Sequence, residues 1–163
     1  MKTILFLLFV ITLFTTARAQ QVGVVTSNAA YSFYQGTWHS KPIDGENPKI
    51  SASDETIGIV TSTAGFVFSN GQWQPRKALL AGDARDISIT VSRGVVGIMT
   101  SRVGYAFSRG QWFQQQISGA PKAITSKNGT LLLITNSHVY AFDSEKNSWS
   151  TAPFNGMTVE YTH

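Results

Sequence analysis

The sequence lacks cysteine altogether, has only three histidines among its 163 residues, and contains no run of basic side chains. Without cysteine there is no disulfide framework, so a domain of this size must rely on its hydrophobic core. Without a basic run, nucleic-acid binding has little support. Charged residues make up only 13% of the chain, while aromatic residues make up 12%. No long segment has helical periodicity after the N-terminal apolar run, so the class is all-β.

The scarcity of histidine also argues against an enzyme. A nucleophilic triad needs a histidine between a hydroxyl or thiol and a carboxylate, and no nucleophile-elbow motif surrounds any serine. The acidic pairs lie in expected turns or inserts, where solvated loop charge explains them better than acid–base catalysis. These pairs are Asp44 and Glu46, Asp54 and Glu55, and Asp83 and Asp86. We therefore expect no catalytic residues and no cofactor.

Metal binding has equally little support. The segment Asp143-Ser-Glu-Lys-Asn147 has the alternating oxygen ligands of a calcium loop. It lacks the sharp-turn glycine and the distal glutamate of such loops. It also falls where the fourth repeat described below has two extra residues. We interpret it as a long turn and expect no metal site.

The longest apolar run lies at the N-terminus. Met1-Lys2 precedes an apolar stretch from Ile4 to Phe14, and Ala17-Arg-Ala19 follows. This order is typical of a secretory signal peptide, here residues 1–19, and the run is too short to span a bilayer. A retained anchor helix is the alternative. We expect a secreted or periplasmic protein that is cleaved after Ala19 and then has no membrane association. The remainder carries eleven basic and nine acidic residues, a net charge of +2.

A fourfold repeat occupies the rest of the sequence. The segment Gln21-Val-Gly-Val-Val-Thr-Ser27 recurs at 56–62 and 95–101, and more loosely at 130–136. The threonines of the four copies are 35, 39 and 35 residues apart, an aromatic residue follows each by five positions, and a phenylalanine follows two positions later. All four tryptophans then fall at one repeat position: Trp38, Trp73, Trp112 and Trp149. Such a period indicates a repeat architecture.

Each repeat predicts four short antiparallel strands, which we name a to d. Strand a carries Ile50, Ile89 or Ile124, strand b is the apolar run, strand c holds the aromatic pair, and strand d begins at the tryptophan. Turns such as Arg93-Gly94 and Asn128-Gly129 suit tight hairpins. Four meandering strands in about 35 residues are typical of a propeller blade. Residues 20–163 would form one domain, with repeats at about 20–46, 47–83, 84–119 and 120–156.

The ends of the repeat region predict a closed ring. The first repeat lacks its own strand a, because Gln20 directly precedes strand b. Tyr161, within Thr158-Val-Glu-Tyr-Thr162, follows Trp149 by 12 residues, the same interval that separates Trp38 from Ile50 and Trp112 from Ile124. We therefore expect a closed four-bladed β-propeller in which residues 157–163 complete the first blade and remove exposed edges. The alternatives are an open array that dimerises into a larger ring and a β-trefoil, although a trefoil has three units.

Strand b has glycine at one repeat position in three of the four units. These are Gly23, Gly58 and Gly97, whereas the fourth unit has Leu132. Four blades would stand about 90° apart, so the gaps between them widen outward and need bulky residues. We predict that each glycine admits an aromatic side chain from the adjacent blade, and that the seam at the fourth unit packs differently.

Two segments carry a family resemblance. Pro48-Lys-Ile-Ser-Ala-Ser-Asp-Glu-Thr-Ile-Gly-Ile-Val-Thr-Ser62, continuing to Gly65-Phe-Val-Phe-Ser-Asn-Gly-Gln-Trp73, resembles a tectonin-type propeller repeat, as does 120–130. The sequence departs from that family where glycine replaces the strand-b tryptophan, and in having four blades. Several tectonin-like proteins bind glycans, so the resemblance implies a lectin-like, carbohydrate-binding module, and the signal-peptide pattern implies that it is exported. The alternative is a protein-interaction or envelope scaffold with no glycan ligand.

Ligand-binding candidates come from the tryptophans and from residues that do not repeat. Tryptophan rings can stack on sugars, although a residue that recurs once per blade is most simply a packing residue. Side chains specific to one unit are where a propeller places specificity, although each could equally be plain surface. The candidates are Trp38, His39, Trp73, Arg76, Arg102, Arg109, Trp112 and Trp149.

Overall fold

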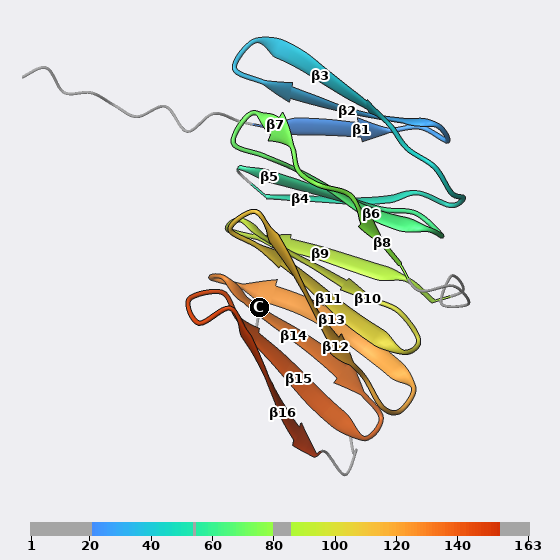
Figure 1. The fold of residues 1–163 in the computed structure, drawn as a ribbon, viewed down its shortest axis with the longest axis vertical. Helices are drawn as coiled ribbons and strands as arrows, with labels where there is room; N and C mark the ends of the chain where they lie inside the picture. The colour runs from blue at the N-terminus through green and yellow to red at the C-terminus, as the bar shows by residue number, and fades with distance from the viewer. Residues whose placement is uncertain (1–20, 54, 80–85, 154–163) are drawn as a thin grey trace, which may run out of the picture.

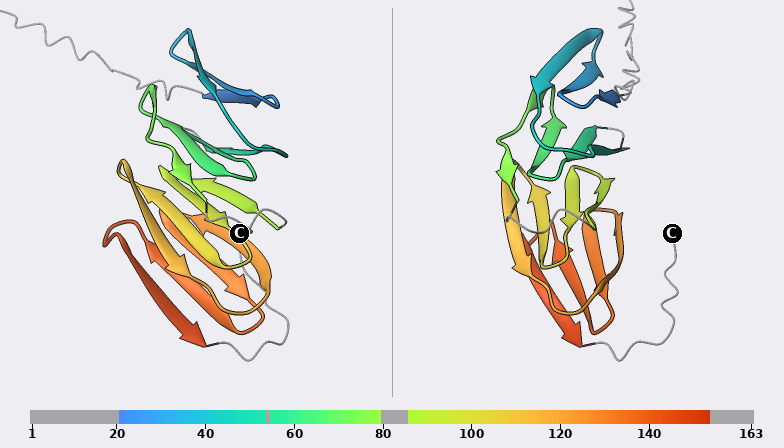
Figure 2. Two further views of the ribbon diagram at one scale, coloured as in Figure 1. Left: turned by 45° about the vertical axis from the view of Figure 1, so that its right-hand side comes forward. Right: turned by 90° about the vertical axis from the view of Figure 1, so that its right-hand side faces the viewer.

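The computed structural model describes residues 21–53, 55–79 and 86–153, and these residues form four antiparallel sheets (Figure 1). The sheets follow one another along the longest axis of the molecule in a curved stack, from β1–β3 at one end to β13–β16 at the other (Figure 2). The predicted signal peptide, residues 1–19, and the predicted closing strand, residues 157–163, lie outside the described residues. The all-β class and the four repeats are confirmed, and closure of the ring stays a prediction.

The strands match the predicted pattern of each repeat. Sheet 1 contains β1 (Val22–Val25), β2 (Ala29–Tyr34) and β3 (Thr37–Pro42). Sheet 2 contains β4 (Lys49–Ser53), β5 (Thr56–Val60), β6 (Ala64–Ser69), β7 (Gln72–Trp73) and β8 (Lys77–Ala78). Sheet 3 contains β9 (Ser88–Ser92), β10 (Val95–Met99), β11 (Val103–Ser108) and β12 (Gln111–Gln116). Sheet 4 contains β13 (Pro121–Lys127), β14 (Thr130–Thr135), β15 (His138–Asp143) and β16 (Ser148–Pro153). In sheet 2 the outer strand is divided, and β7 and β8 both pair with β6.

The threonine at the end of each strand b fastens the turn that follows. The Thr100 Oγ1 accepts the backbone N–H of Val103 at 3.0 Å and donates to the Val103 carbonyl at 3.0 Å. The same pair of bonds joins Thr26 to Ala29 and Thr135 to His138. A threonine hydroxyl both donates and accepts, so one side chain satisfies both backbone groups of the residue three positions on. This requirement explains why the threonine recurs in every repeat.

The glycines of strand b accept aliphatic side chains, so the prediction of an aromatic partner is wrong. A Cβ built on Gly23 would lie 2.6 Å from Ile57 Cδ1, and one on Gly58 would lie 2.6 Å from Val96 Cγ1. At Gly97 the nearest side chain is Leu131. The inner strands lie where the sheets are closest, so there is room for an aliphatic side chain but not for an aromatic ring. In each of the three seams, an aliphatic residue of strand b therefore enters the space above the strand-b glycine of the preceding sheet.

Aromatic residues fill the wider outer part of the same seams, where strand c supplies the glycine. A Cβ on Gly65 would meet Ile98 Cδ1 at 2.6 Å and Trp112 Cη2 at 3.1 Å, and Gly104 faces Leu133 and Trp149 in the same way. Separate hydrophobic clusters occupy the three seams between consecutive sheets. Each sheet therefore has a front face, turned toward the preceding sheet, and a back face, turned toward the next.

Candidate binding surface

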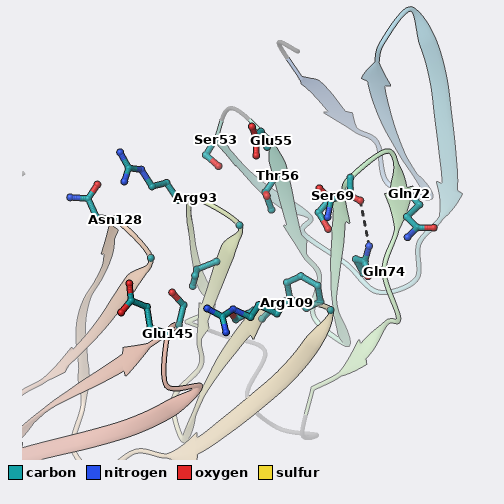
Figure 3. Close-up of a pocket in the computed structure, with 18 residues that line it drawn as sticks. Ser53, Glu55, Thr56, Ser69, Gln72, Gln74, Arg93, Arg109, Asn128 and Glu145 are labelled. Carbon is teal, nitrogen blue, oxygen red and sulfur yellow. Dashed lines mark hydrogen bonds between the residues drawn. The ribbon is translucent and has the colours of Figure 1, made fainter. Parts of the chain in front are cut away.

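The topology gathers two sets of turns at one end of the four sheets. In a four-stranded antiparallel meander, the turn between strands a and b lies at the same end as the turn between strands c and d. We call this end the turn face. It contains an open hollow of about 800 Å³ that spans sheets 2, 3 and 4 (Figure 3). The side chains around it include Ser53, Glu55, Gln72, Gln74, Arg93, Arg109, Asn128 and Glu145.

Most of the side chains that line this hollow are polar. Hydroxyl and amide side chains predominate, and Glu55, Glu145, Arg93 and Arg109 bring charges of both signs. Among the residues that the structure describes, the only large aromatic residue at its wall is Phe107, which is 1% exposed and belongs to the seam between sheets 2 and 3. These residues therefore offer hydrogen bonds and charges to a ligand, and no exposed ring on which a ligand could stack.

Arg93 and Arg109 occupy strained turn positions. Their φ angles are 43° and 50°, and each precedes a glycine with positive φ, which gives the two-residue hairpin turn its required backbone twist. Gln35, Asn70 and Asn128 stand at the equivalent positions of other turns, with φ angles of 48°, 51° and 52°. Asparagine tolerates the left-handed region, whereas arginine has no local hydrogen bond there to offset the strain. Both arginines are exposed, and neither makes an ion pair with a described residue.

The long turn of sheet 4 uses its own carboxylate. Asp143 Oδ1 accepts the backbone N–H of Glu145 at 2.8 Å and that of Lys146 at 3.3 Å. These two backbone hydrogen bonds hold the pKa of Asp143 below its ordinary value of 3.8, and the charge of Lys146 acts in the same direction. The segment is the long turn that the sequence predicts, and the Asp143 carboxylate holds it. Among the described residues, no group of three or more histidine or acidic side chains could hold a metal ion.

Three of the four tryptophans lie between sheets. Trp112 Nε1 donates to the Pro75 carbonyl of sheet 2 at 3.0 Å, and its ring centre lies 5.3 Å from that of Phe107. Trp73 and Trp149 stand 5.2 Å from Phe68 and Phe142 in the same arrangement. These rings pack blade on blade and do not reach the hollow. Trp38 differs, because no sheet precedes it among the described residues and its side chain is 58% exposed.

The remaining candidates do not converge on one site. The ring of His39 lies 5.1 Å from that of Phe68 in the first seam. Arg76 forms a two-point ion pair with Asp44, with Nη2 2.6 Å from Oδ2 and Nε 3.2 Å from Oδ1. Arg102 lies in the turn between strands b and c, at the opposite end of its sheet from the hollow.

Of the eight predicted site residues, only Arg109 lines the hollow. The sequence interpretation missed Arg93, because Arg93-Gly94 was taken only as a hairpin signal. The missed signal was the topology itself, since an antiparallel blade places Arg93-Gly94 and Arg109-Gly110 at one end of sheet 3. Both turns have arginine before the glycine, at a position where asparagine would suit the backbone better. This shared departure would have identified the turn face from the sequence.

No helix among the described residues is long and apolar enough to cross a membrane. No protein-family profile matches the sequence, and no curated protein sequence matches it either.

Solved structures do resemble the fold. The crystal structure of HIRA residues 644–1017 matches with a TM-score of 0.50 and 12% identity, over 83% of this chain and 53% of that one. BamB from Moraxella catarrhalis matches over 81% of this chain and 42% of its own, with a TM-score of 0.38 and 12% identity. The chain thus spans about half the length, or less, of the structures it matches. Because HIRA(644–1017) is a β-propeller, its similarity to this chain agrees with the stacked four-stranded sheets, and the chain has a β-propeller repeat fold.

Proposed function

We propose that this protein is an exported, non-catalytic binding module that holds a polypeptide partner against its turn face. The observation that carries the proposal is the pair Arg93 and Arg109, which extend from strained turns at the rim of one polar hollow. Residues kept in sparsely populated backbone regions concentrate at functional sites, because folding alone disfavours them.

The strain in these two turns has a cost that can be stated in energy. A non-glycine residue in the left-handed region is destabilised by roughly 1–2 kcal/mol, and asparagine is among the residues that adopt it most readily. Folding alone would therefore favour Asn-Gly at 93–94 and 109–110, as at Asn70-Gly71 and Asn128-Gly129. The arginines supply what asparagine lacks, namely long cationic side chains that can form two parallel hydrogen bonds with a carboxylate.

The rest of the lining fits a peptide segment. The hollow is wide and open, and its hydroxyl and amide groups can pair with backbone N–H and C=O groups of a partner. Glu55 and Glu145 add negative charges beside the positive ones, so a partner with carboxylates and scattered basic residues would be complementary to it.

A glycan is the second candidate, because the same hydroxyl and amide side chains can pair with sugar hydroxyls. The resemblance to tectonin-type repeats also favours it. The absence of an exposed aromatic ring around the hollow, within the part of the chain that the structure describes, weighs against it. Export and lack of catalysis rest on the signal-peptide pattern at 1–19 and on the scarcity of histidine.

Two probes distinguish the candidates, namely an array of peptides rich in aspartate and glutamate and an array of glycans. The wild type should bind acidic peptides. The double variant R93N/R109N should keep its turns and bind these peptides at least tenfold more weakly, because the loss of even one charge-assisted hydrogen bond has an effect of that size. R102N is the matched control, since it removes the same charge from the opposite end of sheet 3. Glycan binding without peptide binding would reverse the order of the candidates, and loss of binding in R102N alone would remove the turn face from consideration.

A further inference from the structure

The front face of sheet 1 is apolar and uncovered by described residues. Val22 and Val24 are 54% and 48% exposed, and Trp38 is 58% exposed. Their counterparts in sheet 2 are covered by sheet 1, since Ile57 and Ile59 are fully buried and Trp73 packs against that seam. The exposed side chains of sheet 1 therefore occupy positions that contact a preceding sheet everywhere else in the stack.

The back face of sheet 4 is the matching free end. In sheets 1 to 3 the back face carries small residues that admit the side chains of the next sheet, namely Gly23 and Ala30, Gly58 and Gly65, and Gly97 and Gly104. Sheet 4 has Leu132 and Val139 at these two positions, and both are half-buried. The back face of sheet 4 is thus flatter and more apolar than the three faces that are occupied.

The two free faces are both apolar, and a seam between them would pack differently from the other three. In the existing seams, large aliphatic residues enter above small ones, as Leu131 does above Gly97 and Leu133 above Gly104. At the free ends the back face has Leu132 and Val139, and the front face has Val22 and Val24. The pair of Leu132 and Val22 has more side-chain volume than the pair of Gly97 and Leu131, so the two sheets would stand farther apart in this seam than in the other three.

The arrangement of the stack keeps these faces apart within one copy. Sheets 1 and 4 lie at opposite ends of the longest axis (Figures 1 and 2). The alignment covers 53% of the HIRA(644–1017) chain, so a β-propeller of that size has room for more sheets than the four described here. Propellers of four to eight blades are typical, and two copies of this stack supply eight sheets.

We infer that two copies of this chain assemble head to tail, with sheet 4 of each copy packed on sheet 1 of the other, into one ring of eight sheets. A twofold axis relates the two seams between the copies, so the seams are equivalent. Because the ring closes, no sheet face at the ends of either stack stays uncovered. The inference concerns assembly and does not depend on the ligand of the turn face.

The length of chain after Pro153 agrees with this assembly. Four residues, 117–120, connect the outer strand β12 to the inner strand β13 of the next sheet. The segment Thr158-Val-Glu-Tyr-Thr162 begins after the same interval of four residues beyond Pro153. In the dimer, sheet 4 of one copy packs next to sheet 1 of the second copy. Among the described strands, β1 of sheet 1 has no neighbour on its inner side. Residues 157–163 of one copy would therefore supply the missing strand of the other.

A charge-exchange experiment tests the assembly. V22E places a carboxylate on the front face, where Val22 is exposed in a single copy, and L132K places an ammonium on the back face, where Leu132 is half-buried. Sedimentation equilibrium should give twice the chain mass for the wild type. Each variant alone should dissociate, with its dimer constant weakened roughly 100-fold or more, because an unpaired charge would be buried in the seam. An equal mixture of the two variants should recover the doubled mass, since one seam is then native and the other pairs Glu with Lys.

Only a head-to-tail dimer predicts rescue in the mixture. Far-ultraviolet circular dichroism and tryptophan fluorescence confirm that each variant remains folded. A wild type at the mass of one chain would overturn the inference and would favour residues 157–163, or another protein, as the occupant of sheet 1. A dimer that neither variant weakens, or variants that stay dissociated on mixing, would also overturn it.

Discussion

Replacing Gly58 by alanine tests whether the seams hold the stack together as described. The added Cβ would lie 2.6 Å from Val96 Cγ1, 2.9 Å from Val91 Cγ2 and 3.1 Å from Ile89 Cδ1, all in sheet 3. Carbon atoms pack best at about 3.5–4.0 Å, so the closest contact is short by about 1 Å. Two of the three neighbours are valines, which have little rotamer freedom with which to move away.

The magnitude follows from two opposing effects. Overpacking a core destabilises by roughly 1–3 kcal/mol. Alanine restricts the unfolded chain more than glycine does, which offsets about 0.4–1 kcal/mol. The expected net loss is about 1–2 kcal/mol, measured by urea unfolding followed through tryptophan fluorescence.

A second substitution makes the test specific to the contact. V96A removes the Val96 Cγ1 methyl group that the new Cβ of G58A would strike, so the double variant should be more stable than the sum of the single effects by about 1 kcal/mol. Unchanged stability in G58A, or simple additivity in the double variant, would refute the described seam.

The remaining predictions concern the turns and the end of the chain. R93N and R109N should each raise the free energy of unfolding by up to about 1 kcal/mol, because asparagine relieves the left-handed strain; unfolding measurements that show a loss would mean that the arginines stabilise the fold. The pKa of Asp143, measured by NMR, should lie below 3.8, because the backbone N–H groups of Glu145 and Lys146 favour the charged carboxylate. The stability that this carboxylate contributes should be present above pH 3.8 and disappear as the pH falls through the lowered pKa. A pKa at or above 3.8 would contradict the described turn. Deletion of Met157–His163 should leave a folded chain that sediments at the mass of one copy, because β1 then lacks its inner neighbour; an unchanged doubled mass would show that this segment has no part in assembly.

Much of the fold could be predicted because the same residue types recur at the strand ends and turns of each repeat. The threonines that end each strand b, the turn glycines and the position of the tryptophans specify strand boundaries within each unit, and the structure places them accordingly. The aromatic prediction for Gly23, Gly58 and Gly97 failed because spacing within a unit does not say how closely two sheets approach. Aliphatic residues fill the narrow inner part of the seam, and tryptophans fill the wider outer part.

The candidate surface was predicted less well than the fold. The four tryptophans were named as candidates because their rings can stack on sugars, although packing between blades was the favoured role, and the structure uses three of them in that way. Arg93 and Arg109 lie at one end of sheet 3 because β9, β10, β11 and β12 pair in that order. Closure could not be decided from the sequence, because a matching first and last strand suits a ring of one chain and a ring of two equally well.

One cross-linking measurement tests most directly the claim that the stack is half of a two-chain ring. The chain has no cysteine, so V24C combined with V139C introduces the only two thiols, one on each free face. Treatment with a short bifunctional maleimide should give a covalent dimer on a denaturing gel. A product that stays at the mass of one chain, with the link found between residues 24 and 139 of the same copy, would contradict the account.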